Sequence, residues 1–169
     1  MDTKNTFTRM CIGEAVIRLL KNNNYDKIRV TAIARTAGVS RMTFYKYYET
    51  IYDALTDYLN IIISEYLDEC SRNPDKGSFL DYSHILFALE FFNNYRVFFL
   101  TLASRGLHSI LISGINDFML KYYVNAKDYS VYRLYCYSGG LLNAFLKWEE
   151  SGCTEPVESI AATLCELYN

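Results

Sequence analysis

The sequence predicts an all-α protein with about nine helices, and three observations lead to that prediction. Apolar residues recur at spacings of three and four along much of the chain, as they do on one face of a helix. The alternation typical of strands and the dipeptides typical of hairpins are absent from its 169 residues. Only 2 Pro and 8 Gly interrupt the chain, and its apolar content of 51% suffices for a buried core. We expect one compact helical domain with a smaller domain attached.

Three helices are expected in the first 50 residues. Apolar residues at i, i+3, i+4, i+7 and i+8 predict a first helix over about residues 6–21; they are Ile12, Ala15, Val16, Leu19 and Leu20. Three Asn residues at 22–24 end this helix, because Asn tolerates the left-handed backbone of a helix end. A second helix is expected over residues 30–37, ended by Gly38, and Ser40 is the N-cap of a third over residues 41–47.

Six further helices are expected beyond residue 50. Thr50 and Asp53 have the spacing of a capping box, which predicts a long fourth helix to about residue 70. Residues 73–77 form the clearest linker, and Ser78 with Asp81 repeats the capping pattern at the start of a fifth helix that ends near residue 94. The remaining helices are expected over about residues 95–104, 107–124, 129–150 and 156–167, the last of them opened by Pro156.

Charge is divided unevenly between the two parts of the chain. The first 50 residues contain nine of the 17 Lys and Arg but only four of the 19 Asp and Glu. The N-terminal part therefore carries a surplus of positive charge and the remainder a surplus of negative charge. A chance difference between two solvated surfaces is one explanation; attraction of the first part to phosphate is the other.

Several function classes fit the sequence poorly. The 5 Cys residues are odd in number and scattered, and no signal-peptide pattern is present, so we expect a cytoplasmic protein. The most apolar stretch, residues 79–102, contains too many polar groups for a membrane span. No nucleophile–base set, glycine-rich phosphate loop or metal-ligand spacing is recognisable. We therefore expect neither an enzyme nor a cofactor.

Residues 30–48 carry the strongest functional signal. Two short helices joined by a glycine turn share a small predicted core of Ile33, Ala34, Ala37, Val39 and Phe44. With Phe44 facing inward, the third helix turns a basic, hydroxyl-bearing face outward, as a helix that enters the DNA major groove does. The alternative is an ordinary helical hairpin with a solvated polar face. The candidate DNA-binding residues are Arg29, Thr31, Ser40, Arg41, Met42, Thr43, Tyr45, Lys46 and Tyr47.

This segment resembles the helix-turn-helix domain of TetR-family transcriptional regulators. The residues that match the family pattern are Ile33, Ala34, Ala37, Gly38, Val39, Ser40, Thr43, Phe44, Tyr45, Tyr48 and Leu55. The C-terminal half, with residues 91–95, Gly139 to Leu142 and Trp148, is similar to a regulatory-domain subgroup common in Firmicutes. Two positions depart from the pattern: Arg29 replaces a capping Thr, and Ile51 replaces a Lys that contacts phosphate in many relatives.

The resemblance implies a DNA-binding domain at residues 1–50, followed by a helical effector-binding and dimerisation domain at residues 51–169. It also implies a homodimer, because two recognition helices about 34 Å apart bind a near-palindromic operator in double-stranded DNA. The expected dimer residues lie on the last two helices: Gly139, Gly140, Leu141, Ala144, Phe145, Ile160, Leu164 and Leu167. The alternative is that these helices bury their apolar faces within their own domain.

The implied function is that of a repressor released from DNA by a small apolar or aromatic effector. The expected pocket residues are Phe87, Phe91, Tyr95, Phe99, His108, Phe118 and Tyr122, although each aromatic ring has core packing as an alternative role. A second possibility is a DNA-binding adaptor whose regulatory half binds a protein partner. A regulatory core without a cavity would favour the adaptor.

Overall fold

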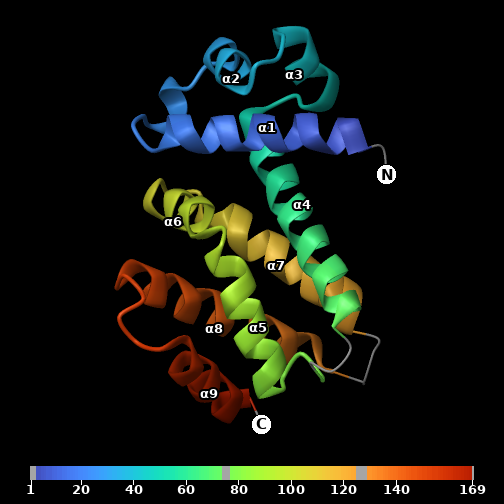
Figure 1. Ribbon diagram of the computed structural model, residues 1–169, viewed down its shortest axis with the longest axis vertical. Coiled ribbons are helices and arrows are strands. Elements are labelled where there is room, and N and C mark those ends of the chain that lie inside the picture. Colours follow the sequence, from blue (N-terminus) through green and yellow to red (C-terminus); the bar gives the residue numbers. More distant parts are fainter. Residues whose placement is uncertain (1–2, 74–76, 125–128, 169) are drawn as a thin grey trace.

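The computed structural model describes residues 3–73, 77–124 and 129–168, and within these ranges it is built from helices without strands (Figure 1). The predicted all-α fold class is confirmed, with nine α-helices in the part of the chain that is described. They are α1 (Thr3–Leu20), α2 (Val30–Ala37), α3 (Arg41–Tyr47), α4 (Ile51–Arg72), α5 (Tyr82–Asn93), α6 (Arg96–Ser104), α7 (His108–Tyr123), α8 (Val131–Glu150) and α9 (Val157–Tyr168). A short 3₁₀ helix, η1 (Tyr25–Lys27), precedes α2.

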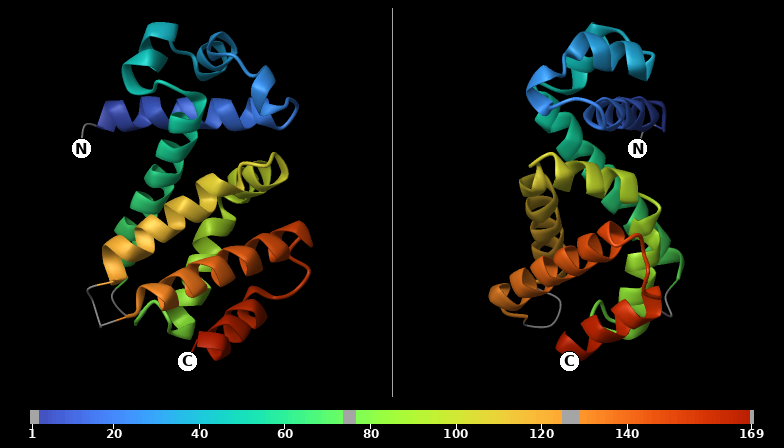
Figure 2. Two further views of the ribbon diagram at one scale, coloured as in Figure 1. Left: turned by 180° about the vertical axis from the view of Figure 1, so that it is seen from behind. Right: turned by 90° about the vertical axis from the view of Figure 1, so that its left-hand side faces the viewer.

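The helices α1 to α3 form a head at one end of the molecule, and α4 to α9 form a larger body (Figure 1). In the head, α1 packs against α2, and α2 packs against α3. The helix α4 starts against α1 and runs from the head into the body (Figures 1 and 2). In the body, α7 packs on α4 and α8, and α5 packs along α9. The helix α4 therefore belongs to both parts, with contacts to α1 in the head and to α7 in the body.

One hydrophobic core runs through both parts. It includes Ile12 of α1, Phe44 of α3, Leu59 of α4, Phe99 of α6 and Leu164 of α9. A domain boundary at residue 50 remains a prediction; that position is the N-cap of α4.

Local capping explains where several helices begin. The Ser40 side chain accepts a hydrogen bond from the Thr43 amide at 2.9 Å, as the sequence predicted for α3. At α4 the Thr50 hydroxyl accepts from the Asp53 amide at 3.1 Å and the Asp53 carboxylate accepts from the Thr50 amide at 2.8 Å, so the predicted capping box is confirmed.

The start of the fifth helix was predicted incorrectly. The Asp81 carboxylate accepts from the Ser78 amide at 2.6 Å, but the Asp81 amide donates to the Ser78 carbonyl at 2.8 Å, which closes a turn instead of a helix. Asp81 itself has an extended backbone and occupies the N-cap position, so α5 begins at Tyr82. The linker predicted just before this turn includes residues 74–76, which lie outside the described ranges.

No single helix in the described ranges has both the length and the apolar character needed to span a membrane. In the part of the chain that the structure describes, α5 and α6 taken together are long and apolar enough, but they are bent by 76° relative to each other.

We predict that alkaline pH destabilises this fold. Burial raises the pKa of Tyr58 and of Tyr123 to about 12, and it raises the pKa of Tyr66 well above 10.0. Above about pH 10 the unfolded chain therefore binds fewer protons than the native chain, so the free energy of unfolding falls as pH rises toward 12. Tyrosinate absorbance should rise together with loss of the helical circular dichroism signal. Complete ionisation of the phenols before any loss of helix would contradict the burial of these rings.

Candidate nucleic-acid interface and internal cavity

The turn between α2 and α3 is fixed by its backbone conformation and by a small core. Gly38 has φ +69°, a left-handed conformation that is costly for residues with a Cβ. The next residue, Val39, donates its amide to the Ala34 carbonyl at 2.9 Å, which closes the end of α2. Ile33 and Phe44 are both fully buried beneath the turn. This combination sets the angle between the two helices, as in a helix-turn-helix.

The outer face of α3 is exposed and basic. Arg41 and Lys46 lie on the surface, with Met42 78% exposed and Tyr45 51% exposed between them. The helix α3 lies on the side of the head that faces away from the body (Figure 1). The exposed face of α3 thus presents two cationic side chains, one phenol and one apolar side chain.

The remaining predicted DNA-binding residues differ in their surroundings. Thr31 is exposed in the first turn of α2, and Arg29 occupies the N-cap position of α2 without capping it through its side chain. The Arg29 guanidinium instead donates to the Asp26 carbonyl at 2.6 Å. Ser40 uses its hydroxyl to cap α3, and the Thr43 hydroxyl lies 2.9 Å from it.

Tyr47 is held less freely than the sequence suggested. Its side chain is half-buried, and its hydroxyl donates to the Asn5 side chain of α1 at 2.7 Å. This bond ties the end of α3 to the first helix, so Tyr47 has a structural role besides any contact with a ligand.

A charged network connects the head to α4. The Arg9 side chain of α1 donates from Nε to the Asp57 carboxylate of α4 at 2.8 Å and donates again from Nη2. The Tyr48 hydroxyl donates to the same carboxylate at 2.6 Å. The hydrogen bond to Asp57 raises the pKa of Arg9, while burial, followed by the hydrogen bond to Asp57, raises the pKa of Tyr48. Sequence reasoning missed this network, because Arg9 and Asp57 are 48 positions apart.

A second link joins the head to the body at the other end of α1. The Arg105 guanidinium, in the turn after α6, donates to the Lys21 carbonyl at 2.5 Å. The carbonyls at the end of a helix lack partners within the helix, so this cation is favourably placed. The head is therefore held at α4 and at the turn between α6 and α7.

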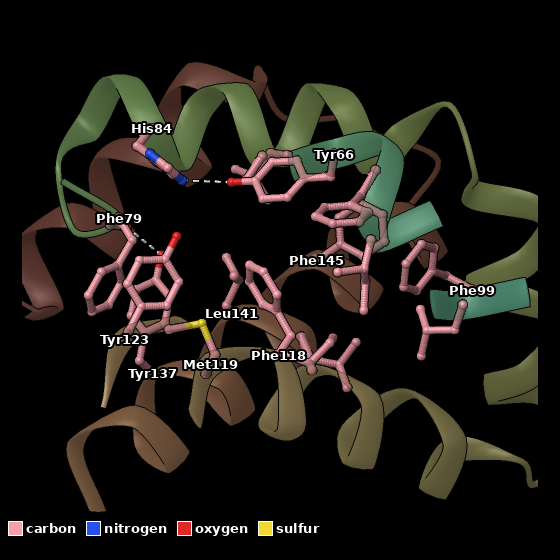
Figure 3. A pocket seen from close by; sticks show the side chains of 17 residues that line it. Tyr66, Phe79, His84, Phe99, Phe118, Met119, Tyr123, Tyr137, Leu141 and Phe145 are labelled. Carbon is pink, nitrogen blue, oxygen red and sulfur yellow. Dashed lines mark hydrogen bonds between the residues drawn. The ribbon is translucent and has the colours of Figure 1, made fainter. Parts of the chain in front are cut away.

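The body encloses a cavity of about 60 Å³ (Figure 3). Its walls come from Leu59, Ile63 and Tyr66 of α4, Phe79, His84, Ala88, Leu89 and Phe92 in and before α5, Phe99 of α6, Ile115, Phe118, Met119 and Tyr123 of α7, and Tyr137, Leu141, Leu142 and Phe145 of α8. Figure 3 places the Tyr66–His84 pair on one wall, facing Phe118, Met119 and Leu141.

Two of the seven predicted pocket residues line this cavity, Phe99 and Phe118. Phe87, Phe91 and Tyr95 instead line a groove on the outer side of α4 and α5, where the Tyr95 hydroxyl donates to Glu65. His108 and Tyr122 are not among the residues around the cavity. The reason is that α5 is aromatic on both sides, so its sequence did not indicate which side faces inward. The sequence also missed the Tyr66–His84 pair, which only the meeting of α4 and α5 creates.

The residues expected at a dimer interface are divided between surface and interior. Phe145 and Leu164 are buried within the chain, Leu141 lines the cavity, and Ala144 and Ile160 are half-buried. A Cβ at Gly140 would collide with the Tyr168 hydroxyl, whereas a Cβ at Gly139 would meet open space. Leu167 is 71% exposed.

The surface of α8 has further exposed apolar residues near Gly139. Val131 and Tyr135 are more than two-fifths exposed and Tyr132 is 83% exposed. The end of α9 lies beside this part of α8, because the Tyr168 hydroxyl donates to the Cys136 carbonyl at 3.2 Å. We call Val131, Tyr132, Tyr135, Gly139 and Leu167 the α8–α9 surface.

In the described part of the chain, no three His, Cys, Asp or Glu side chains lie close enough together to hold a metal ion.

Comparison with family models and with curated proteins finds no match. Among solved structures, the dihydroxyacetone kinase operon activator DhaS superimposes with a TM-score of 0.60 at 16% identity, covering 95% of this chain and 93% of its own. The fatty acid degradation regulator FadR from Bacillus halodurans superimposes with a TM-score of 0.63 at 12% identity, covering 95% of this chain and 94% of its own. The chain thus has the fold of these two regulators over nearly its full length.

We predict that Asp57→Asn lowers the free energy of unfolding by about 1–3 kcal/mol, because it removes the charge that holds Arg9 and Tyr48. The side chains of Arg9 and Asp57 are only 20% and 21% exposed. A matched control is Glu69→Gln, whose partner Arg72 is 68% exposed and which should cost less than about 1 kcal/mol. Urea unfolding would measure both; an equal loss in the two variants would show that the network is no stronger than a surface ion pair.

Proposed function

We propose that the protein is a cytoplasmic DNA-binding transcription regulator of the TetR family, which binds its operator as a homodimer and is released by a small-molecule effector. The observation that carries this proposal is the exposed face of α3, presented on a helix-turn-helix fixed by Gly38 and Phe44. The full-length likeness in fold to an operon activator and a degradation regulator supports it.

Each exposed residue of α3 suits a contact that DNA offers. Arg41 matches the paired acceptors on a guanine edge, and Met42 suits the methyl group of thymine. Lys46 and the Tyr45 hydroxyl suit phosphate oxygens, which position a protein on the duplex. The positive surplus in the first 50 residues favours the same partner, since cations that replace counterions on the phosphates gain affinity.

A homodimer is supported by the α8–α9 surface. Gly139 leaves room for the backbone of another helix to approach closely, and exposed Tyr132, Tyr135 and Leu167 supply apolar area on the same two helices. A symmetric pair built on this surface leaves both heads, at the opposite end of the chain, free to bind one operator (Figure 2).

Control by an effector is supported by the path from the cavity to the head. Leu59 and Tyr66 of α4 form part of the cavity wall, and Asp57 on the same helix holds Arg9 and Tyr48. A ligand that prefers one position of α4 changes operator affinity by its difference in binding free energy between the two positions. In this proposal the bound protein blocks transcription, so that release by the effector lifts repression. The adaptor alternative expected a regulatory core without a cavity, and the cavity favours the small molecule.

We predict that Lys46→Ala lowers affinity for every duplex and reduces the slope of log affinity against log salt concentration by about 1, because it removes one phosphate contact. Tyr45→Ala should weaken operator binding roughly tenfold. Fluorescence anisotropy with a duplex selected from a random-sequence library would measure both. Lys121→Ala, at an exposed position of α7, is the control and should leave affinity unchanged. Unaltered affinity and salt slope in both α3 variants would refute the assignment.

We predict that Gly139→Arg converts the dimer to a monomer with unchanged helix content. The new side chain would enter open space in the single chain but would place a charge in the dimer interface. Analytical ultracentrifugation would give the mass, with Ser113→Arg on exposed α7 as the control. If Gly139→Arg remains dimeric, the interface lies elsewhere.

A further inference from the structure

We infer that the internal cavity binds an uncharged, single-ring molecule that carries one hydroxyl or amino group, and that this group hydrogen-bonds the Tyr66–His84 pair. The inference rests on the proposed effector control and adds the chemical class of the effector.

The cavity wall excludes charged ligands. Among the described residues around it, none is an Asp, Glu, Lys or Arg. A buried carboxylate, phosphate or ammonium needs an opposite charge or several hydrogen bonds to offset the loss of water. The wall instead consists of aliphatic and aromatic side chains with Met119, which favours a neutral and mostly apolar ligand.

Four side chains bring polar atoms to the wall, Tyr66, His84, Tyr123 and Tyr137, and two of them form a buried pair. The Tyr66 hydroxyl lies 2.7 Å from Nε2 of His84, and both side chains are buried. Burial raises the pKa of Tyr66 well above 10.0, so the phenol remains protonated. Tyr137, on another wall, already donates its hydroxyl to the Phe79 carbonyl at 2.8 Å. The Tyr66–His84 pair is therefore a buried polar point against which a ligand can be oriented (Figure 3).

The Tyr66 hydroxyl retains one position for a ligand. A phenol oxygen offers one donor and two acceptor positions. His84 occupies one of them, and the tautomer of its ring decides whether that position is the donor or an acceptor. A further position on the Tyr66 hydroxyl therefore remains for a ligand. A ligand hydroxyl or amino group, which can donate and accept, fits either arrangement.

Size and shape restrict the ligand further. A volume of about 60 Å³ is smaller than the roughly 150 Å³ of an engineered cavity that binds benzene, so even a one-ring ligand requires the walls to move apart, and a long acyl chain or a nucleotide is far too large. Phe92, Phe118 and Phe145 surround the space with ring faces and edges, and aromatic rings pack favourably in such surroundings at offset or perpendicular angles. The ligand class is thus a small aromatic alcohol, phenol or aromatic amine that is neutral at physiological pH.

Four probes of nearly equal size test this inference. Benzyl alcohol has the ring and the donor, ethylbenzene lacks the donor, and benzoate and benzylammonium add a negative and a positive charge. We expect benzyl alcohol to bind about 3- to 10-fold more tightly than ethylbenzene, as one neutral hydrogen bond allows. The two ions should not bind. Isothermal titration calorimetry would measure the affinity of each probe, and the rise in melting temperature with probe concentration would check it.

Two variants and one control variant test whether the probes bind in this cavity. Tyr66→Phe should remove the difference between benzyl alcohol and ethylbenzene while leaving ethylbenzene affinity unchanged, and Tyr82→Phe, at an exposed position of α5, should change neither. Ala88→Leu should weaken both neutral probes by filling the cavity. The inference is overturned if benzoate or benzylammonium binds as tightly as benzyl alcohol, or if the advantage of benzyl alcohol survives in Tyr66→Phe.

Measuring duplex binding by the same protein distinguishes a failure of this inference from a failure of the proposed function. Selective benzyl alcohol binding by a protein that binds no duplex at low salt would uphold the ligand class and overturn the regulator. Duplex binding by a protein that takes up none of the neutral probes would overturn the ligand class and leave the DNA-binding role standing.

Discussion

The Asp57 carboxylate is the contact on which the rest of this structure depends. It accepts hydrogen bonds from Arg9 of α1 and from Tyr48 at the end of the helix-turn-helix, and so fixes both to the helix that enters the body. A partly buried carboxylate with a bidentate guanidinium and a phenol is a rigid joint, because each donor restricts the others. The position of the α3 surface relative to the body therefore depends on α4, together with the bond from Arg105 to the Lys21 carbonyl.

The cavity of the body lies against the same helix, α4. The cavity lies between α4, α5, α7 and α8, and Tyr66 lies on α4 farther from the head than Asp57. Close packing elsewhere leaves little freedom for side chains to absorb a ligand locally: a Cβ at Gly114 of α7 would collide with Leu59 of α4. A molecule that enlarges the cavity must therefore move α4 or α7. Effector control as proposed would act through α4, because α4 lines the cavity and also carries the joint at Asp57.

The aromatic residues of the body serve two different purposes. On the inner side of α5, His84 and Phe92 face the cavity, whereas Phe87 and Phe91 lie on the outer groove beside Glu65 and Glu69. The inner rings stabilise the core through perpendicular and tilted contacts, such as Phe99 with Phe145 at 5.2 Å between ring centres. The outer rings are partly open to water. An aromatic-rich sequence is therefore insufficient evidence for a pocket at any one residue.

The sequence by itself determined the elements that depend on neighbours within a few positions. The bounds of α2 and α3, the caps at Ser40 and Thr50, and the inward side of Phe44 were predicted correctly, because caps, glycine turns and helical periodicity are local effects. Tertiary structure decided the rest. The side of α5 that faces the cavity, and the meetings of Arg9 with Asp57 and of Tyr66 with His84, were outside sequence reasoning. The burial of Phe145 and Leu164 within the chain was one of two alternatives that the sequence left open. The two meetings join residues far apart in the chain, and in helices that are apolar on several sides only packing selects the side that is buried.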